Sequence, residues 1–374
     1  MKHNFRIIIG MLALAIPLCV NAQNDVQQQV NELNGKVDRM PKISGFVQGM
    51  FQANLDESGK LLTGDNASTF RMRRVRMSVE GNLAKGLTYK IQGDFTRKPM
   101  LVDAFLKYKA CDAFAIQVGQ FKIPFSIESP INPVNLEIFD YGEAIQRLVG
   151  YNDVCGVGSL GRDLGIMATG SLFPVEMQNG QKFGIVNYSI GIFNGNGANE
   201  KDNNNWKDIV GRLDIHPGLK DLTLSGSYYY GKYYKDEKNN GARIRWAAGA
   251  QYNNGDLVVR AEYLNGTTGS LIDIVGSDGQ VTGTEEILTG SNGYYAEAGY
   301  NFKLGKDSRQ KLMPVARYEH FTENVGLGGG TDWYTVGVNY WPLKSVNFKF
   351  DYSLIMNGDD INGHRIVGLL SYKF

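Results

Sequence analysis

The chain has few of the residues that crosslink, interrupt or anchor a fold. Its 374 residues include only 3 cysteines and 10 prolines. Cys19 lies in an apolar N-terminal segment, which leaves Cys111 and Cys155; their pairing does not follow from the sequence, and a disulfide framework is not predicted. Beyond residue 22 there is no run of about 18 apolar residues, which excludes a transmembrane helix there.

Neither sign of charge is in excess. The chain has 39 Lys and Arg against 38 Asp and Glu, with a formal net charge of +1. Loss of an N-terminal segment carrying Lys2 and Arg6 leaves a remainder close to neutrality. A chain without a strong basic excess is not expected to bind nucleic acid.

Motifs for catalysis, metals and cofactors are also missing. The 4 histidines are scattered, and neither HExxH nor CxxC occurs. Glu319 and His320 are adjacent, but strand alternation puts them on opposite faces. The glycines of residues 156–161 fit the dinucleotide spacing, yet they precede a strand and do not open a helix. We therefore predict no enzyme, no metal site and no cofactor.

Residues 1–22 have the layout of an export signal. Two basic residues precede an apolar run that ends at Val20, and Ala22 provides a small residue for cleavage. Lipidation at Cys19 is the weaker alternative. We predict that residues 1–22 are a signal peptide and that the protein leaves the cytoplasm.

Residues 23–40 carry a short heptad pattern that ends before Pro41. Its apolar positions are Val26, Val30, Leu33, Val37 and Met40. The stripe is too short to form a stable helix alone. We predict a helical, coiled-coil segment that joins subunits of an oligomer; a disordered tether is the alternative.

From Ile43 onward, the chain repeats about ten alternating residues followed by a turn. Phe348 and Phe350 share one parity, whereas Lys349 and Asp351 share the other. We count roughly sixteen such segments, an even number typical of bacterial outer-membrane barrels. The 46 glycines, 20 tyrosines and 18 phenylalanines suit such a protein. Alternation alone would also fit a soluble sandwich.

The connections favour the barrel. Segments 82–86 and 341–345 are short, whereas 265–292 and 356–363 are long and polar, which is the asymmetry of periplasmic turns and extracellular loops. Unpaired strand edges cannot be left in hydrocarbon, so the barrel must close. We predict that residues 41–374 form an all-β, closed antiparallel transmembrane β-barrel in the lipid of the bacterial outer membrane, with an aqueous channel.

One connection is much longer than the others. Residues 122–161 begin at a Lys122-Ile123-Pro124 break and lack a strand period. Structureless segments of this length are uncommon unless they have a function. We predict that this segment folds into the lumen as a constriction loop.

The charged parity of the strands should line the channel, where rings of Arg and Lys select anions. The basic excess on this parity is small. In the dense cluster FRMRRVR at 70–76, Arg74 and Arg76 would project inward, and pairing with acids across the lumen is an equal alternative. Arg71 and Arg73 would meet lipid phosphates. The residues predicted to line the pore or bind anions are Arg74, Arg76, Lys90, Lys107, Lys122, Arg147, Arg162, Arg212, Arg243, Arg245, Arg260 and Arg317.

Four segments, in their order along the chain, resemble the phosphate-selective porin O and P family. They are FRMRRVRMSVEGNL at 70–83, LVDAFLKY at 101–108, GQFKIPFSIE at 119–128 and GRDLGI at 161–166. The resemblance implies a trimeric, sixteen-stranded porin with an arginine ladder and a lysine-bearing constriction that binds phosphate. By position, Arg74 and Arg76 match the ladder strand and Lys122 matches a constriction lysine. The nearly balanced lumen departs from the strongly basic channel of the family.

Together these features predict a water-filled channel for passive diffusion of small solutes, with a preference for anions such as phosphate, assembled as a homotrimer. The alternatives are a diffusion porin without phosphate selectivity and a barrel that anchors a surface-binding protein. An outer-membrane hydrolase would need a Ser or Asp with a partnered His, and the sequence provides no convincing set.

Overall fold

The computed structural model describes residues 40–63, 67–158, 160–177, 180–236, 239–275, 280–305 and 310–374. The expected signal peptide, and the expected coiled-coil segment apart from Met40, lie outside these residues. No helix within the described ranges is long and apolar enough to cross a membrane.

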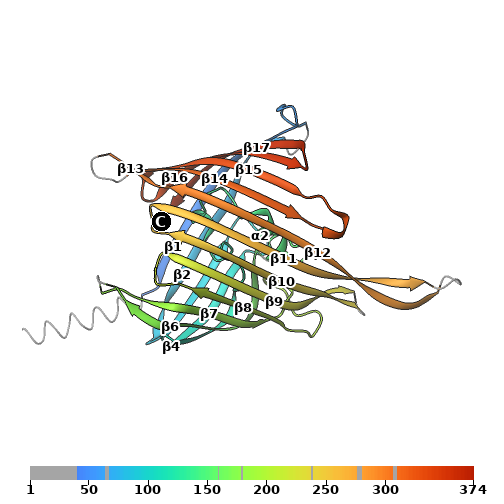
Figure 1. The fold of residues 1–374 in the computed structure, drawn as a ribbon. Coiled ribbons are helices and arrows are strands. Elements are labelled where there is room, and N and C mark those ends of the chain that lie inside the picture. Colours follow the sequence, from blue (N-terminus) through green and yellow to red (C-terminus); the bar gives the residue numbers. More distant parts are fainter. Residues whose placement is uncertain are drawn as a thin grey trace, which may run out of the picture.

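The chain forms one antiparallel sheet that closes on itself (Figure 1). Its strands are β1 (Lys42–Leu55), β2 (Ser68–Ala84), β3 (Leu87–Asp94), β4 (Leu101–Cys111), β5 (Phe114–Lys122), β6 (Arg162–Glu176), β7 (Lys182–Phe193), β8 (Asp208–Ile215), β9 (Leu222–Asp236), β10 (Asn239–Asn253), β11 (Leu257–Val275), β12 (Val281–Tyr300), β13 (Phe302–Leu304), β14 (Gln310–Thr322), β15 (Thr331–Leu343), β16 (Val346–Asn357) and β17 (Asp360–Lys373).

The sheet has 17 strands but sixteen positions around the barrel. β12 and β13 both pair with β14, and only Asn301 separates them, so β13 continues β12. β1 pairs with β2 on one side and with β17 on the other, which closes the barrel. Among the described residues, closure therefore leaves the barrel wall without an edge strand, as a hydrocarbon environment requires. The predicted closed barrel of about sixteen strands is confirmed.

Burial along the strands is the reverse of that in a soluble protein. On β16, Phe348 and Phe350 are 47% and 55% exposed, whereas Lys349 and Asp351 are 3% and 1% exposed. A soluble sandwich would bury the aromatic parity and expose the charged one. The apolar parity therefore forms the outer wall, and the charged parity faces the interior.

The two ends of the barrel differ. At one end, here called the short-turn end, residues 85–86, 112–113 and 344–345 join neighbouring strands. At the opposite end, here called the loop end, the longer connections include 194–207. Short turns face the periplasm in outer-membrane barrels, which is the orientation that we expect for the short-turn end.

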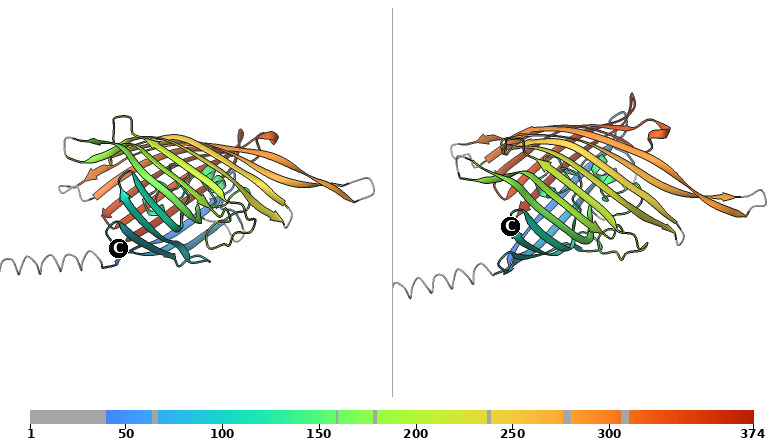
Figure 2. Two further views of the ribbon diagram at one scale, coloured as in Figure 1. Left: turned by 90° about the horizontal axis from the view of Figure 1, so that it is seen from below. Right: turned by 60° about the horizontal axis from the view of Figure 1, so that its bottom comes forward.

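Segments 265–292 and 356–363 are not the loops that the sequence suggested. β11 and β12 stay paired from the barrel wall up to Val275 and Val281, and this hairpin extends well beyond the loop end (Figures 1 and 2). Likewise, β16 and β17 are separated only by residues 358–359. Outside the membrane both faces of a hairpin contact water, so polar residues do not end the strand pairing.

Candidate functional site

The connection between β5 and β6 contains two short helical turns, η1 (Pro133–Asn135) and α2 (Glu143–Leu148). At η1, the Asn132 side chain accepts a hydrogen bond from Val134 N, and Pro133 takes the first helical position. At α2, Gly142 is the N-cap. A Cβ there would lie 1.8 Å from Nη2 of Arg317, so a larger residue would displace the Arg317 side chain.

This segment packs against the interior of the barrel. Phe125, Ile145 and Leu148 are at most 2% exposed and share one apolar cluster with inward-facing residues such as Leu264 and Tyr295. α2 contacts β11, β12 and β14, and the views of Figures 1 and 2 show it among the strands. Burial of these side chains stabilises the segment inside the barrel.

Buried ion pairs join the segment to strands far away in sequence. Glu128 accepts from Arg317 on β14 at 2.6 and 3.0 Å. Asp153 accepts from Arg243 and Arg245 on β10 at 2.9 and 3.0 Å. The side chains of these five residues are at most 4% exposed. The two-oxygen, two-nitrogen contact of Glu128 with Arg317 is the strongest form of such a pair.

A further carboxylate and a lysine hold the middle of the segment. Glu137 pairs with Arg260 on β11 at 3.1 Å. Lys349 on β16 donates to the carbonyl oxygens of Leu136 and Ile138. These polar side chains satisfy backbone and carboxylate groups that would otherwise be buried without partners.

The basic side chains that make these contacts are here called the anchor groups. They are Arg212, which donates to the Ser126 carbonyl, together with Arg243, Arg245, Arg260, Arg317 and Lys349. Five of them were predicted to line the pore or bind anions: Arg212, Arg243, Arg245, Arg260 and Arg317. The structure brings each of these five to an oxygen of the 122–161 segment.

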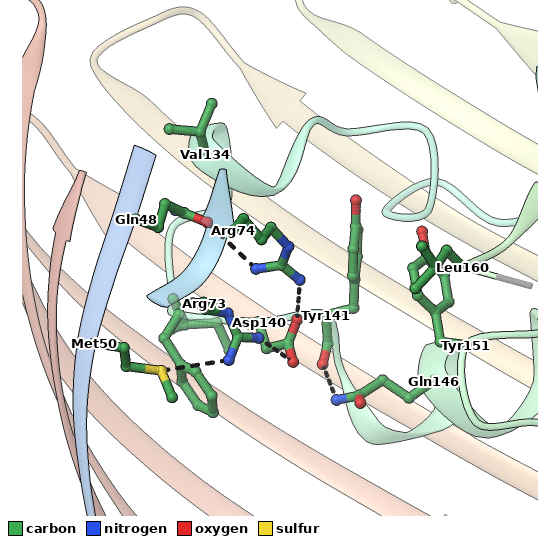
Figure 3. A network of polar contacts seen from close by, with 12 residues as sticks. Gln48, Met50, Arg73, Arg74, Val134, Asp140, Tyr141, Gln146, Tyr151 and Leu160 are labelled. Carbon is green, nitrogen blue, oxygen red and sulfur yellow. Dashed lines mark hydrogen bonds and ion pairs between the residues drawn. The ribbon is translucent and has the colours of Figure 1, made fainter. Parts of the chain in front are cut away.

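Asp140 connects the segment to β2, as Figure 3 shows. Arg73 and Arg74 both pair with its carboxylate, Arg74 at 3.1 Å, and Arg74 also donates to Gln48 on β1 at 3.4 Å. Burial by itself would raise the pKa of Asp140, but the charges of Arg73 and Arg74 outweigh burial and hold the pKa below its ordinary value.

The expectation that Arg73 meets lipid phosphate is wrong, because β2 contains a bulge. Gln48 on β1 pairs with Arg74 while Gly49 pairs with Met72, so Arg73 is an extra residue in the ladder. A bulge shifts the side-chain parity, and two consecutive arginines therefore reach the same carboxylate.

Further basic side chains lie close to Arg73 and Arg74. Arg76 on β2 pairs with Asp94 on β3 at 2.8 Å, and Arg162 on β6 pairs with Asp103 on β4 at 2.6 Å. Arg97 lies 3.9 Å from Asp94. Lys122 on β5 lies opposite Arg162 in the strand pairing of β5 with β6. It is also close enough to Arg76 for the two positive charges to repel each other.

We call this group the basic cluster. It contains six cations, and the three carboxylates they contact or approach are Asp94, Asp103 and Asp140. Its members are Arg73, Arg74, Arg76, Arg97, Lys122 and Arg162. Asp163, the neighbouring acid on β6, is directed elsewhere and accepts from the backbone of Gly195 at 2.7 Å.

Two hollows lie on either side of the basic cluster. The hollow nearer the loop end has a volume of about 260 Å³ and is lined by Arg97, Lys98, Tyr151 and Arg162 among others. The hollow at the short-turn end has a volume of about 330 Å³. Its charged lining residues are Lys42, Glu80, Lys90 and Lys107.

The other predicted site residues have different surroundings. Lys122 donates to three oxygens, those of the Ser129 carbonyl, the Ile131 carbonyl at 2.9 Å and the Tyr141 hydroxyl at 2.8 Å. Its ammonium group therefore holds the segment. Arg147 pairs with Glu323 near the loop end.

Lys90 and Lys107 form no ion pair with any described residue. Both are partly exposed in the hollow at the short-turn end.

Sequence reasoning left Arg365 out of the predicted site residues. It lies on β17 and makes no ion pair within the described part of the chain. Its guanidinium lies 4.7 Å from the ring centroid of Phe139, and that of Arg73 lies 5.1 Å from the same centroid. The inward parity of Arg365 was visible in the sequence, but its contact with Phe139 depends on the path of the long segment.

The residues weighed for catalysis, metal binding and disulfide formation have the following surroundings. His320 contacts Asp332 at 2.9 Å on the outer side of the barrel, while Glu319 faces inward and contacts Arg317 at 2.9 Å. Cys111 and Cys155 are both free thiols. Among the described residues, no three His, Cys, Asp or Glu side chains gather as metal ligands would.

Comparison with known proteins agrees with this architecture. The sequence profile of the family described as phosphate-selective porin O and P matches residues 45–365. Comparison with curated proteins gave no match.

Among solved structures, the chain is similar to a Salmonella typhi OmpF complex with daunomycin, with 15% identity over 90% of this chain and 98% of that one and a TM-score of 0.60. An anion-selective porin from Comamonas acidovorans shares 13% identity over 90% and 99% of the two chains, with a TM-score of 0.59. The trimer form of OmpT, an outer membrane protein of Vibrio cholerae, shares 12% identity over 90% and 99%, also with a TM-score of 0.59. At these identities the likeness concerns the fold.

Proposed function

The chain belongs to the phosphate-selective porin O and P family and is an outer-membrane channel, and from this premise we propose that it conducts small anions passively across the bacterial outer membrane. The proposal combines three parts: a path for the solute, a segment that narrows this path, and a charge excess along it. Each part is supported by a different set of contacts.

The solute path runs past the basic cluster. The hollow near the loop end and the hollow at the short-turn end lie on either side of this cluster, and both are lined partly by basic side chains. Six cations against three carboxylates make the potential along this path positive. This charge excess is the observation that carries the anion preference.

The segment at 122–161 acts as the constriction. The anchor groups hold it to β8, β10, β11, β14 and β16, and its apolar residues also pack with inward-facing residues of β5, β6 and β7. We place the remaining passage beside the basic cluster, where Asp140 of the segment contacts Arg73 and Arg74 of β2 (Figure 3). Preorganised charges in such a narrow passage act strongly on a partly dehydrated ion.

The solute class is small inorganic anions, including phosphate. A second candidate, an anion channel without phosphate selectivity, is favoured by one observation. Lys122, the residue that matches a constriction lysine of the family, already donates to three oxygens of the chain itself. An ammonium group with all three hydrogens engaged has no donor left for a phosphate oxygen.

Assembly and targeting complete the proposal. We propose that residues 1–22 direct export, that residues 23–40 form a short coiled coil, and that three copies associate. A similar structure is described as a trimer form, which supports this stoichiometry. Three tethered ends held close together would lower the entropy cost of pairing short helices.

Reversal potentials in planar bilayers under a KCl gradient test the anion preference. The double variant Arg97→Gln, Lys98→Gln removes two cations from the hollow near the loop end without touching an anchor group. We expect the chloride-to-potassium permeability ratio to fall by about threefold, as partly screened charges at contact distance predict. The matched control is Arg147→Gln, which removes a paired charge near the same end and should leave the ratio nearly unchanged. A cation-selective parent channel, or equal effects of the two changes, contradicts the proposal.

Phosphate titration separates the two candidate functions. A channel with a phosphate site loses chloride conductance as phosphate is added at constant ionic strength. A channel whose Lys122 is fully engaged shows no such block.

A further inference from the structure

A third cavity lies inside the barrel at the short-turn end, apart from the two hollows beside the basic cluster. Its volume is about 390 Å³, within the range of small-molecule sites. Leu136 of the 122–161 segment lines it together with Val258, Met313 and Trp341 from the inner faces of β11, β14 and β15. Lys311 and Lys344 also line it.

The cavity ends at a layer of buried ion pairs. Glu137 pairs with Arg260 at 3.1 Å, and Arg260 pairs with Glu297 at 2.9 Å. The three side chains are 10%, 1% and 1% exposed. A solute that enters from the short-turn end therefore meets closed packing, which separates this cavity from the proposed anion path.

The charges around the cavity are not balanced. Glu137 also lines it, but its carboxylate is already paired with Arg260. Lys311 and Lys344 form no ion pair or hydrogen bond with any described side chain. Within the part of the chain that the structure describes, the cavity thus combines an apolar wall with two ammonium groups that have no ion-pair partner, a combination that suits an amphipathic anion and not a hydrated inorganic ion.

We propose that this cavity binds a small organic carboxylate with an apolar body. The carboxylate pairs with Lys311 and Lys344, and the body packs against Leu136, Met313 and Trp341. The ligand enters from the periplasmic side. It contacts Leu136 and Glu137, which Lys349 and Arg260 hold in place, so its binding stabilises the anchored segment by mass action.

Fluorine NMR of 4-fluorobenzoate with the detergent-solubilised full chain tests this site directly. We expect saturable broadening of the 4-fluorobenzoate resonance and much weaker broadening for the uncharged 4-fluorobenzamide. Acetate at equal concentration should not displace 4-fluorobenzoate, because acetate lacks the apolar body. The double variant Lys311→Gln, Lys344→Gln should bind 4-fluorobenzoate about tenfold more weakly, which corresponds to about 1.4 kcal/mol. Trp341→Ala should weaken binding to a similar degree through loss of aromatic contact.

The matched control is Lys220→Gln, which removes an exposed lysine hydrogen-bonded to Gln181 at the same end of the barrel. It should bind as the parent does. Equal affinity of the parent and the double lysine variant, or equal binding of the amide and the acid, overturns the proposal. Because the measurement needs no ion conduction, it is independent of whether the anion channel proposal holds.

Discussion

The basic cluster and the anchor groups are both rich in arginine, yet they differ in how their charge is used. The anchor groups are six cations with at least six carboxylates around them, and they lie beside the large apolar cluster that contains Ile145 and Leu148. The basic cluster has six cations for three carboxylates, and hollows lie on both sides of it. The carboxylates around the anchor groups are Glu128, Glu137, Asp153, Glu262, Glu297, Glu319 and Asp351.

The comparison shows that the number of arginines on the inner wall does not measure an anion preference. A buried arginine that is paired with a carboxylate holds two parts of the chain together. Removal of one partner leaves the charge of the other without compensation. Only an arginine that exceeds its local carboxylates contributes to the field that a passing ion experiences. The four predictions below test this distinction.

The largest effect is expected from removing an anchor charge. Arg317→Met leaves Glu128, Glu297 and Glu319 close together without their shared cation. We expect the 122–161 segment to lose about 3–5 kcal/mol of its attachment to the wall, as for other broken buried pairs. Hydrogen exchange of residues 126–145 should rise sharply. The control, Lys303→Met, breaks an exposed pair with Asp256 that does not involve the segment and should leave this exchange unchanged. Unchanged protection in Arg317→Met would show that apolar packing alone holds the segment.

Two matched aspartate variants distinguish the two regions directly. Asp140→Asn leaves Arg73 and Arg74 unpaired beside the proposed path, so the chloride preference should increase about threefold. Asp153→Asn leaves Arg243 and Arg245 unpaired behind the apolar cluster, so selectivity should stay the same while hydrogen exchange of the segment rises. Reversal potentials and hydrogen exchange, measured on both variants, show whether each aspartate acts on selectivity or on attachment of the segment. An equal gain in selectivity from both would remove the distinction between the regions.

Acid should loosen the segment through the same two carboxylates. Burial by itself would raise the pKa of Asp153, but Arg243 and Arg245 hold it below its ordinary value, as Arg73 and Arg74 do for Asp140. Carboxylates with a lowered pKa contribute stability above the ordinary value of 3.8 and lose it as the pH falls through the lowered pKa.

Through these two carboxylates, single-channel conductance should become noisy or change in size only below about pH 4. The double variant Asp140→Asn, Asp153→Asn should lack this acid transition. A transition that persists unchanged in the double variant would assign it to other groups.

The smallest effect is expected at the short-turn end. Lys90 and Lys107 are partly exposed in a wide hollow, where water and salt screen their charges. Lys90→Gln, Lys107→Gln should change the permeability ratio by less than about twofold at 0.1 M KCl and have no effect at 1 M. An effect larger than that of the Arg97 and Lys98 variant would place the selective part of the path at the periplasmic mouth.

The sequence predicted the barrel well because its signals are local. Alternation with period two distinguishes the faces of each strand, and each turn follows from a few residues. The parity of Phe348 and Lys349 indicated which of them faces the membrane, and the structure agrees. The prediction failed where parity breaks: the bulge at Arg73 adds one residue to β2, and no residue type in FRMRRVR marks its position.

The pairings inside the barrel could not be predicted in this way. Glu128 and Arg317 are 189 residues apart, and Asp153 and Arg243 are 90 apart. With a dozen candidate cations and nearly as many acids on the inner parity, sequence alone leaves many possible partners. The path of the 122–161 segment selects among them, and that path depends on burial of residues such as Ile145 and Leu148.

By itself, the sequence determined a closed outer-membrane barrel of about sixteen strands, which face carries charge, and where the long segment interrupts the wall. The physical reason is that hydrocarbon on one side and water on the other impose a period that each strand must obey by itself. Only the tertiary structure decided which arginines hold the segment and which exceed their carboxylates, because charge compensation depends on contacts between residues that folding brings together from distant parts of the chain.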